Sequence, residues 1–526
     1  MFLPRQQPLT GWLSLRIEDN TEKRPIRLKF GLRGDAARGA LAMDFSKSRG
    51  DCLVGVYPGA QESTPVEQML SWSLEGGLIR SVKVEDDRAW AEAEVTETDG
   101  ELKLCHSLSF PESGYGDGRS AEDRAQDLLA VPEAVTLRDN AEEWRSLWCD
   151  ALLFSAGGRQ FARDLVIWQY YLLGTLSDFP CVLGATSLWV SAWGGRQFWD
   201  ADMWLFRATL LLWPKLARSI PAWRAQTLEP VRENAAATNC CGGWFSWQVD
   251  GKGRGGRTLP HLKEVHNNIW VALAAWDAYR ECEDPAFLRT VTWPLLAAIS
   301  DYFCSRARKE NDGLYHIRQV LGPNESVEEV QHTLYDDNTL TNHGVRTILD
   351  IAIDCAKRLG VDAPLKWKDV IDGLFLLGSD ARGIIPEHAN YNGEGIKQAD
   401  LILIFYPLGY KASPEMIRAN VEYYESKILN NGPMMSLSMS ALLLMRCGAK
   451  EEGMRMLQNG ILPFLRGPHR LLCECRDDGN RNIVFHTGAG GVLQALLYGY
   501  LEADVEQTER IPRVRDVCPD FSLEPV

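Results

Sequence analysis

Apolar and polar residues alternate through the first part of the chain. Apolar side chains stand two apart in segments 12–17, 26–30 and 102–108. This is the pattern of a strand with one buried face. Segments 81–85 and 89–95 alternate in the same way on either side of Asp86-Asp87, and this arrangement predicts a hairpin. We therefore expect an antiparallel β module at the start of the chain.

Beyond about residue 140 the apolar spacing becomes that of helices. Ile269, Leu273 and Trp276, for example, follow one another at steps of four and three and so share one helix face. About twelve segments carry this spacing, near 160–175, 200–212, 214–238, 264–280, 285–307, 338–358, 365–376, 398–409, 414–427, 434–447, 450–465 and 488–502. Long connections recur after alternate helices, at 240–262, 309–337, 377–397 and 466–486.

Helical hairpins whose long loops lie on one side are typical of an (α/α)6 barrel, in which those loops gather at one mouth and carry the site. Segment 111–125 has no period and is interpreted as a loop. We therefore expect a mainly α fold, an (α/α)6 barrel preceded by a small antiparallel β-sandwich. The expected boundaries are 1–125 for the β-sandwich-like domain, 126–158 for a linker, 159–510 for the barrel and 511–526 for a C-terminal tail.

Composition and charge exclude several classes of partner. The 526 residues carry 56 Lys and Arg against 71 Asp and Glu, a net charge of −15, so there is no basic excess for nucleic acid or an anionic membrane. No run of about 18 apolar residues could span a bilayer, and the first residues lack the layout of a secretory signal. The 13 cysteines are scattered, without metal-site spacing, and indicate reduced thiols. We expect a cytoplasmic protein that needs no metal or cofactor.

Tryptophan is in clear excess. The 18 tryptophans indicate a core or a pocket built on aromatic side chains. Four of them lie in polar and aromatic clusters expected at the mouth: Trp199, Trp204, Trp244 and Trp247. Trp270 and Trp276 lie on predicted helices, where we expect them to pack.

Each polar cluster, taken alone, has an ordinary structural explanation. Asp200 and Asp202 could cap the helix that they enter. Glu325 follows Gly-Pro-Asn as a turn residue would, and an isolated His266 is typical of a structural histidine. The glycines of 488–491 lack the Lys-Ser/Thr of a phosphate-binding loop.

Taken together and in order, the clusters resemble glycoside hydrolase family 65. The matching motifs are Phe198-Trp-Asp200, the Trp247 loop, Glu264-x-His266, Gly322-Pro-x-Glu325, Asp337-Asn338 with Thr341-Asn342, Lys397-Gln-Ala-Asp400 and Thr487-Gly-Ala-Gly-Gly491. The resemblance extends over about residues 140–505 and is strongest for the hydroxylysine-disaccharide glucosidases, because of Glu474 and the motif that ends at Gln494. The family also contains acid trehalases and the maltose, trehalose and kojibiose phosphorylases.

The resemblance implies an N-terminal β-sandwich, a helical linker and an (α/α)6 barrel. It makes Glu325 the general acid and Glu474 the general base of the hydrolytic members. The residues that it implies in sugar binding are Phe198, Trp199, Asp200, Trp247, His266, Lys397 and Gln398. The expected reaction is inverting hydrolysis of an α-glucosyl disaccharide or α-glucosylated conjugate, with the two carboxyl groups about 6.5–9.5 Å apart to admit water. The partner is then a small-molecule glycoside or glycoconjugate.

The chain departs from the family pattern around these residues. Asn324 and Ser326 replace an Asp and a Tyr beside the acid, Gln248 replaces a Glu, and Leu472 replaces a Trp before the base. The β module is also about half the usual size, so we expect a divergent and truncated member. Two alternatives follow. One is a repurposed relative that catalyses acid chemistry on a non-sugar metabolite or binds a ligand without turnover. The other is an inverting disaccharide phosphorylase, although Glu474 would repel its phosphate.

Overall fold

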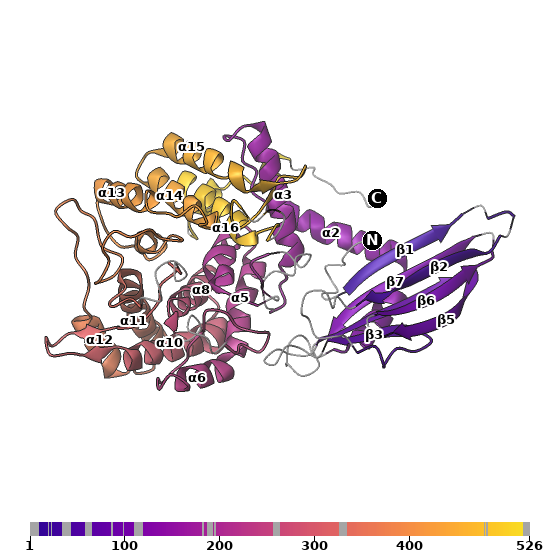
Figure 1. Ribbon diagram of the computed structural model, residues 1–526, viewed down its shortest axis with the longest axis horizontal. Coiled ribbons are helices and arrows are strands. Elements are labelled where there is room, and N and C mark those ends of the chain that lie inside the picture. Colours follow the sequence, from indigo (N-terminus) through magenta and orange to yellow (C-terminus); the bar gives the residue numbers. More distant parts are fainter. Residues whose placement is uncertain are drawn as a thin grey trace. The chain divides into compact units, whose positions relative to one another are not determined.

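The structure is a computed structural model of the chain (Figure 1). It describes residues 10–18, 20–22, 24–33, 44–57, 66–85, 88–97, 99–109, 119–180, 183–186, 193, 196–255, 263–325, 334–477, 479, 482–505 and 507–518. The Asp86-Asp87 turn, most of the loop expected at 111–125 and the Ser326 position lie outside these residues. The chain divides into two compact units, residues 1–149 with 518–526 and residues 150–517.

In the described residues, the first unit contains seven antiparallel strands in two sheets. They are β1 (Thr10–Ile17), β2 (Ile26–Arg33), β3 (Cys52–Tyr57), β4 (Val66–Glu75), β5 (Gly77–Glu85), β6 (Arg88–Val95) and β7 (Gly100–Ser109). One sheet has the order β1-β7-β4-β3 and the other β2-β6-β5. The strands β3 and β4 were not expected, but the antiparallel sheets at this end of the chain are confirmed.

The two sheets enclose one core between them. Leu53, Leu70 and Leu104 from the first sheet pack in a cluster with Ala89 of the second. Phe30 and Trp72 meet edge to face across the sheets, with ring centroids 5.3 Å apart. The alternation in sequence is therefore explained by residues that face inward at every second position.

A helix covers the other face of the larger sheet. In α1 (Ala121–Ala130) the small residues Ala121 and Ala125 pack with Leu128 against Val54 and Met69. A second helix, α2 (Glu133–Cys149), follows. Periodicity assigned neither helix, because α1 presents alanines to the sheet and α2 buries no apolar residue.

Helices make up most of the second unit (Figure 1). They are α3 (Arg159–Thr175), η3 (Asp200–Leu205), α4 (Phe206–Leu210), α5 (Pro214–Gln226), α6 (Leu228–Ala236), α8 (Asn267–Cys282), α9 (Pro285–Phe287), η4 (Leu288–Thr292), α10 (Trp293–Arg306), α11 (Thr339–Leu359), α12 (Leu365–Gly373), η5 (Leu401–Ile404), α13 (Pro414–Glu425), α14 (Met435–Arg446), α15 (Lys450–Gly460), η6 (Leu462–Phe464), α16 (His486–Gln494), η7 (Ala495–Tyr500), η8 (Thr508–Arg510) and α17 (Val514–Val517). Short strand pairs join β8 (Arg308–Lys309) to β9 (Tyr315–His316) and β10 (Leu465–Arg466) to β11 (Leu471–Leu472). The helix-rich class is confirmed.

Two predicted helices differ from the structure, and proline accounts for both differences. The segment 214–238 is divided into α5 and α6 at Thr227, because Pro230 has no N–H to donate to the preceding turn. The segment 398–409 holds only the short η5, and Pro407 lies just beyond it. No helix in the described residues is long and apolar enough to cross a membrane.

A helix near the end of the unit lies against helices near its start. Helix α16 contacts α3 (Figure 1) and η3, although about 290 to 310 positions separate these segments along the chain. Gly490 permits this approach, because a Cβ at that position would lie 2.7 Å from the carbonyl oxygen of Trp204. Gln494 then donates to the carbonyl oxygens of Met203 and Trp204 at 3.1 and 3.0 Å. The glycine-rich motif therefore serves close helix packing.

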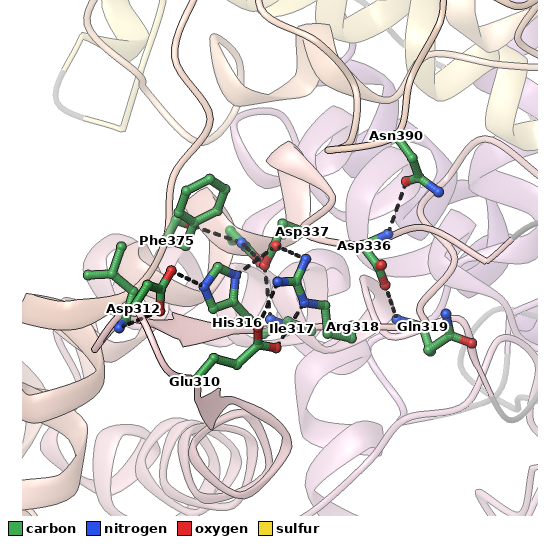
Figure 2. A network of polar contacts seen from close by, with 12 residues as sticks. Glu310, Asp312, His316, Ile317, Arg318, Gln319, Asp336, Asp337, Phe375 and Asn390 are labelled. Carbon is green, nitrogen blue, oxygen red and sulfur yellow. Dashed lines mark hydrogen bonds and ion pairs between the residues drawn. The ribbon is translucent and has the colours of Figure 1, made fainter.

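A polar network anchors the segment that leads to Glu325 (Figure 2). The two ring nitrogens of His316 lie 2.8 Å from Asp337 Oδ2 and 2.9 Å from Asp312 Oδ2. Arg318 donates to the same oxygen of Asp337 at 2.7 Å. Asp337 also receives hydrogen bonds from the backbone N–H of Ile317 and from Asn342. The Asp337…Asn342 motif is thus a scaffold beside the site.

This network is expected to stabilise the protein most at mildly acidic pH. Although burial opposes the charged imidazole, hydrogen bonds to Asp337 and Asp312 raise the pKa of His316 above 6.5. A group whose pKa is raised by folding stabilises fully below its unfolded pKa, and that contribution disappears as pH rises through the folded value. In urea unfolding, His316→Gln should therefore lose about 1.5–3 kcal/mol at about pH 6 and less at about pH 8.5. A loss that does not change with pH would contradict the charged state.

Candidate functional site

A cavity of about 330 Å³ lies within the second unit. All of the site residues predicted from the sequence except His266 line it: Phe198, Trp199, Asp200, Trp247, Glu325, Lys397, Gln398 and Glu474. These residues come from loops and helix starts that are up to 276 positions apart, from Phe198 to Glu474. The fold therefore gathers the predicted clusters around one space.

Both oxygens of the Glu325 carboxyl accept hydrogen bonds. Trp247 Nε1 donates to Oε1 at 3.0 Å, and Lys397 Nζ donates to Oε2 at 3.0 Å. The side chain of Glu325 is 19% exposed and that of Lys397 is 30% exposed, so both meet the cavity without being at the open surface. An indole and an ammonium thus fix the direction of this carboxyl.

Asn324, the residue before Glu325, lies beside two buried acids, Glu387 and Asp400. Asn324 Nδ2 donates to Glu387 Oε1 at 2.8 Å, while its Oδ1 accepts from the backbone N–H of Lys397 at 2.9 Å. Burial raises the pKa of Asp400 to about 7, and burial together with the charge of Asp400 raises that of Glu387 well above its usual range. An aspartate in place of Asn324 would add a third carboxyl and could not donate. Asparagine therefore fits the surroundings of this position better than the aspartate of the family pattern.

Asp200 and Asp202 form tertiary contacts and do not cap their helix. No side chain caps the start of η3. Thr487 Oγ1, at the start of α16, donates a short hydrogen bond to Asp200 Oδ1. Burial raises the pKa of Asp200 to about 6, against the effect of that hydrogen bond. Asp202 instead forms a buried ion pair with Arg224. The capping interpretation is wrong for both residues.

Glu474 enters the cavity from the loop after β11. Asn482 Nδ2 donates to its Oε2 at 3.0 Å, and its backbone carbonyl accepts from the N–H of Met434 at 2.9 Å. Although burial opposes the charged ammonium, the negative charges of Glu325 and then of Glu474 raise the pKa of Lys397. The two carboxyl groups therefore act electrostatically on the same lysine.

Aromatic rings form much of the cavity wall. Phe198 lies edge to face with Trp247, with ring centroids 5.5 Å apart, and with Trp193 at 6.2 Å. Trp193 was missed, because it belongs to no motif or period. Trp204 and Trp244 were expected at the mouth but are each 1% exposed and absent from the lining. Trp244 instead stacks on the buried ring of Tyr302, with centroids 6.1 Å apart.

His266 lies behind the cavity, which corrects its expected contact with the sugar. Its side chain is fully buried and hydrogen-bonded to Glu264, and Glu264 lines the cavity in its place. Glu264 pairs with Leu321 in an isolated bridge, whereas His266 already has helical backbone angles at the start of α8, where Trp270 donates to its ring. The Glu-x-His motif indicated that this segment belongs to the site, but it did not show which of the two residues faces the cavity.

Comparison with known proteins agrees with this geometry. The glycosyl hydrolase family 65 central catalytic domain matches residues 175–395 and 390–466. The chain belongs to glycoside hydrolase family 65.

Named relatives match much of the chain. A kojibiose hydrolase from Flavobacterium johnsoniae is 32% identical over 391 residues, which are 73% of this chain and 56% of that protein. A protein-glucosylgalactosylhydroxylysine glucosidase from Mus musculus is 29% identical over 427 residues, 76% of this chain and 60% of that protein. The chain thus spans less than two thirds of the length of these relatives.

A solved structure shares the fold. A putative kojibiose phosphorylase from the human microbiome superposes with a TM-score of 0.73 at 13% sequence identity, over 95% of this chain and 72% of that one. At this identity the likeness concerns the arrangement of the elements alone.

Proposed function

We propose that this chain is an inverting glycoside hydrolase that acts on an α-glucosyl disaccharide or an α-glucosylated conjugate. The observation that carries the proposal is the presence of Glu325 and Glu474 on the wall of one aromatic cavity. Membership of the family and the names of the relatives, a kojibiose hydrolase and a glucosidase among them, support it. We propose also that the helices of residues 159–510 form an (α/α)6 barrel, with the cavity at its mouth.

Glu325 is the general acid in this proposal. It would protonate the glycosidic oxygen as the bond to the anomeric carbon breaks. Trp247 and Lys397 hold its two oxygens by hydrogen bonds. Entry of the sugar offers hydroxyl groups to Lys397, which frees Oε2 of Glu325 to carry the transferred proton.

Glu474 is the general base. Its carboxylate would take a proton from a water molecule that attacks the anomeric carbon from the opposite face, so that the product has inverted configuration. Asn482 holds one of its oxygens at 3.0 Å and so orients the carboxylate. The charge of Lys397 keeps the space between the two carboxyl groups polar.

The glucosyl unit would be bound by the remaining wall. Trp199, Phe198 and Trp247 offer aromatic surface for the C–H groups of a pyranose ring. Asp200 and Gln398 offer polar atoms for its hydroxyl groups. An uncharged sugar also agrees with the net charge of −15, which disfavours anionic substrates.

The reaction can be tested by following the anomers of the product by NMR. With kojibiose, trehalose and a glucosylgalactosyl-hydroxylysine peptide as substrates, we expect β-glucose as the first product of at least one, at a rate that phosphate does not change. Glu474→Gln should lower the rate about 100- to 10,000-fold, because the amide cannot accept the proton from water. Release of glucose 1-phosphate would instead favour the phosphorylase, and no turnover of any glycoside would favour a repurposed protein.

A further inference from the structure

One carboxyl group on the cavity wall has a free oxygen and no role in the proposed reaction. Glu264 lines the cavity, and its Oε1 is hydrogen-bonded to His266. Its Oε2 is buried and has no hydrogen-bond partner in the described part of the chain. A buried polar atom without a partner is disfavoured, so the position calls for a ligand group that completes it.

The residues behind Glu264 fix its orientation. Trp270 Nε1 donates to His266 Nδ1 at 2.9 Å. An indole N–H can only donate, so Nδ1 accepts and the proton of the neutral imidazole is on Nε2. Burial lowers the pKa of His266 to about 3, which keeps the ring neutral. The Nε2–H group therefore donates to Glu264 Oε1, and Oε2 is the oxygen of this cavity-lining residue that has no partner in the described part of the chain.

The surroundings of Glu264 define the kind of group that can bind there. Burial and then the charge of Glu325 raise the pKa of Glu264 well above its usual range, against the opposing charge of Lys397. Asp200 and Asp400 raise it further. These carboxyl groups would repel an anion. A carboxyl with one bonded oxygen offers lone pairs on the other oxygen, and an O–H donor as well when it is protonated, and both match a hydroxyl group.

We propose that Glu264 is a specificity-determining residue, whose Oε2 forms a hydrogen bond with one hydroxyl group of the sugar in the cavity. His266 and Trp270 are positioning residues that hold the carboxyl from behind. The inference rests on the proposed function in one respect, that the ligand is a glucosyl unit. A sugar that lacks the hydroxyl would leave Oε2 unpaired and bind more weakly.

Binding of monodeoxy sugars to the full chain tests this contact. The probes are glucose and its 2-, 3-, 4- and 6-deoxy analogues, measured by calorimetry or by the fluorescence of the cavity tryptophans. For the wild type, one analogue should bind about 5- to 150-fold more weakly than glucose, which is the effect of one lost hydrogen bond. Glu264→Leu should bind glucose and that analogue equally. Equal affinity of all analogues for the wild type, or unchanged discrimination in Glu264→Leu, would overturn the proposal, as would the absence of glucose binding.

Glu264→Gln separates the hydrogen bond from the negative charge. The amide keeps an oxygen for His266 and an N–H donor for the sugar. We therefore expect glucose affinity within about 5-fold of the wild type and the same discrimination among analogues. A loss greater than about 150-fold would show that the charge is required, and would refute the neutral contact. This variant remains informative if Glu264→Leu fails to fold.

Glu425→Gln is the matched control. This carboxyl is mostly buried and accepts from Ser440 at 2.7 Å, but it does not line the cavity. Its substitution should leave sugar binding unchanged. Since the readout is binding, normal glucose binding without hydrolysis would refute the proposed reaction alone, and hydrolysis without a role for Glu264 would refute this inference alone.

Discussion

Glu325→Gln is expected to lower kcat/KM for an α-linked glucosyl disaccharide by about 100- to 10,000-fold, while the protein stays folded. The amide oxygen can still accept from either Trp247 or Lys397, so one of the two contacts is kept, but the group has no acidic proton to give to the leaving oxygen. The loss should therefore appear in kcat, which is measured by initial rates of glucose release.

A substrate with a good leaving group separates acid catalysis from binding. The fluoride of α-glucosyl fluoride leaves with little help from an acid, so Glu325→Gln should retain much more of its activity on this substrate than on the disaccharide. Glu451→Gln is the control for the chemical change, because the side chain of Glu451 is 95% exposed. Equal losses on both substrates would show that Glu325 is not the acid.

Asp202→Ala is expected to lower the free energy of unfolding by about 3–5 kcal/mol, because it leaves the guanidinium of Arg224 buried without its counter-charge. The two side chains are 0% and 1% exposed. Arg224 Nε lies 3.1 Å from Asp202 Oδ1, and its Nη2 also donates to the carbonyl of Phe198 at 3.2 Å. Burial raises the pKa of Asp202 even beside Arg224, which shows how strongly this site disfavours charge.

An exposed ion pair provides the comparison for this loss. Lys368 and Asp372 form a contact whose side chains are 63% and 60% exposed. Asp372→Ala should cost no more than about 1 kcal/mol in the same urea titration. A similar loss of unfolding free energy in the two variants would contradict the prediction, because it would mean that burial does not increase the cost of leaving Arg224 unpaired. Because Arg224 also holds Phe198, Asp202→Ala should reduce sugar binding even where the protein is folded.

Much of the fold could be predicted from local spacing. Alternation located β1, β2 and β5 to β7, because each of these strands has one face on the core between the sheets. Steps of three and four located α11, which buries one face, and also α8 and α14, which are buried on almost all sides. Spacing failed for α2, which buries only Thr136 and so has no apolar stripe to detect.

The site was harder to predict, because contacts between distant residues leave no local pattern. The order of the motifs predicted that Glu325, Lys397 and Glu474 belong to one site, and all three line the same cavity. It could not show that Glu264, and not His266, faces that space, since the two are separated by a single residue and the backbone decides which side chain points inward. Trp193 followed no period at all. Trp193 itself has a left-handed φ of 48°, which no sequence spacing indicates.

The contact of α16 with η3 has a consequence for the order in which the protein folds. Asp200 and its partner Thr487 are 287 positions apart. During synthesis, the apolar surface around Trp204 therefore remains uncovered until nearly the whole unit has left the ribosome. Contacts of such sequence separation slow folding and prolong the exposure of surfaces that aggregate. The cavity wall is completed only after α16 has been synthesised, so a nascent chain that stalls before α16 holds one carboxyl of the site without the hydroxyl that anchors it.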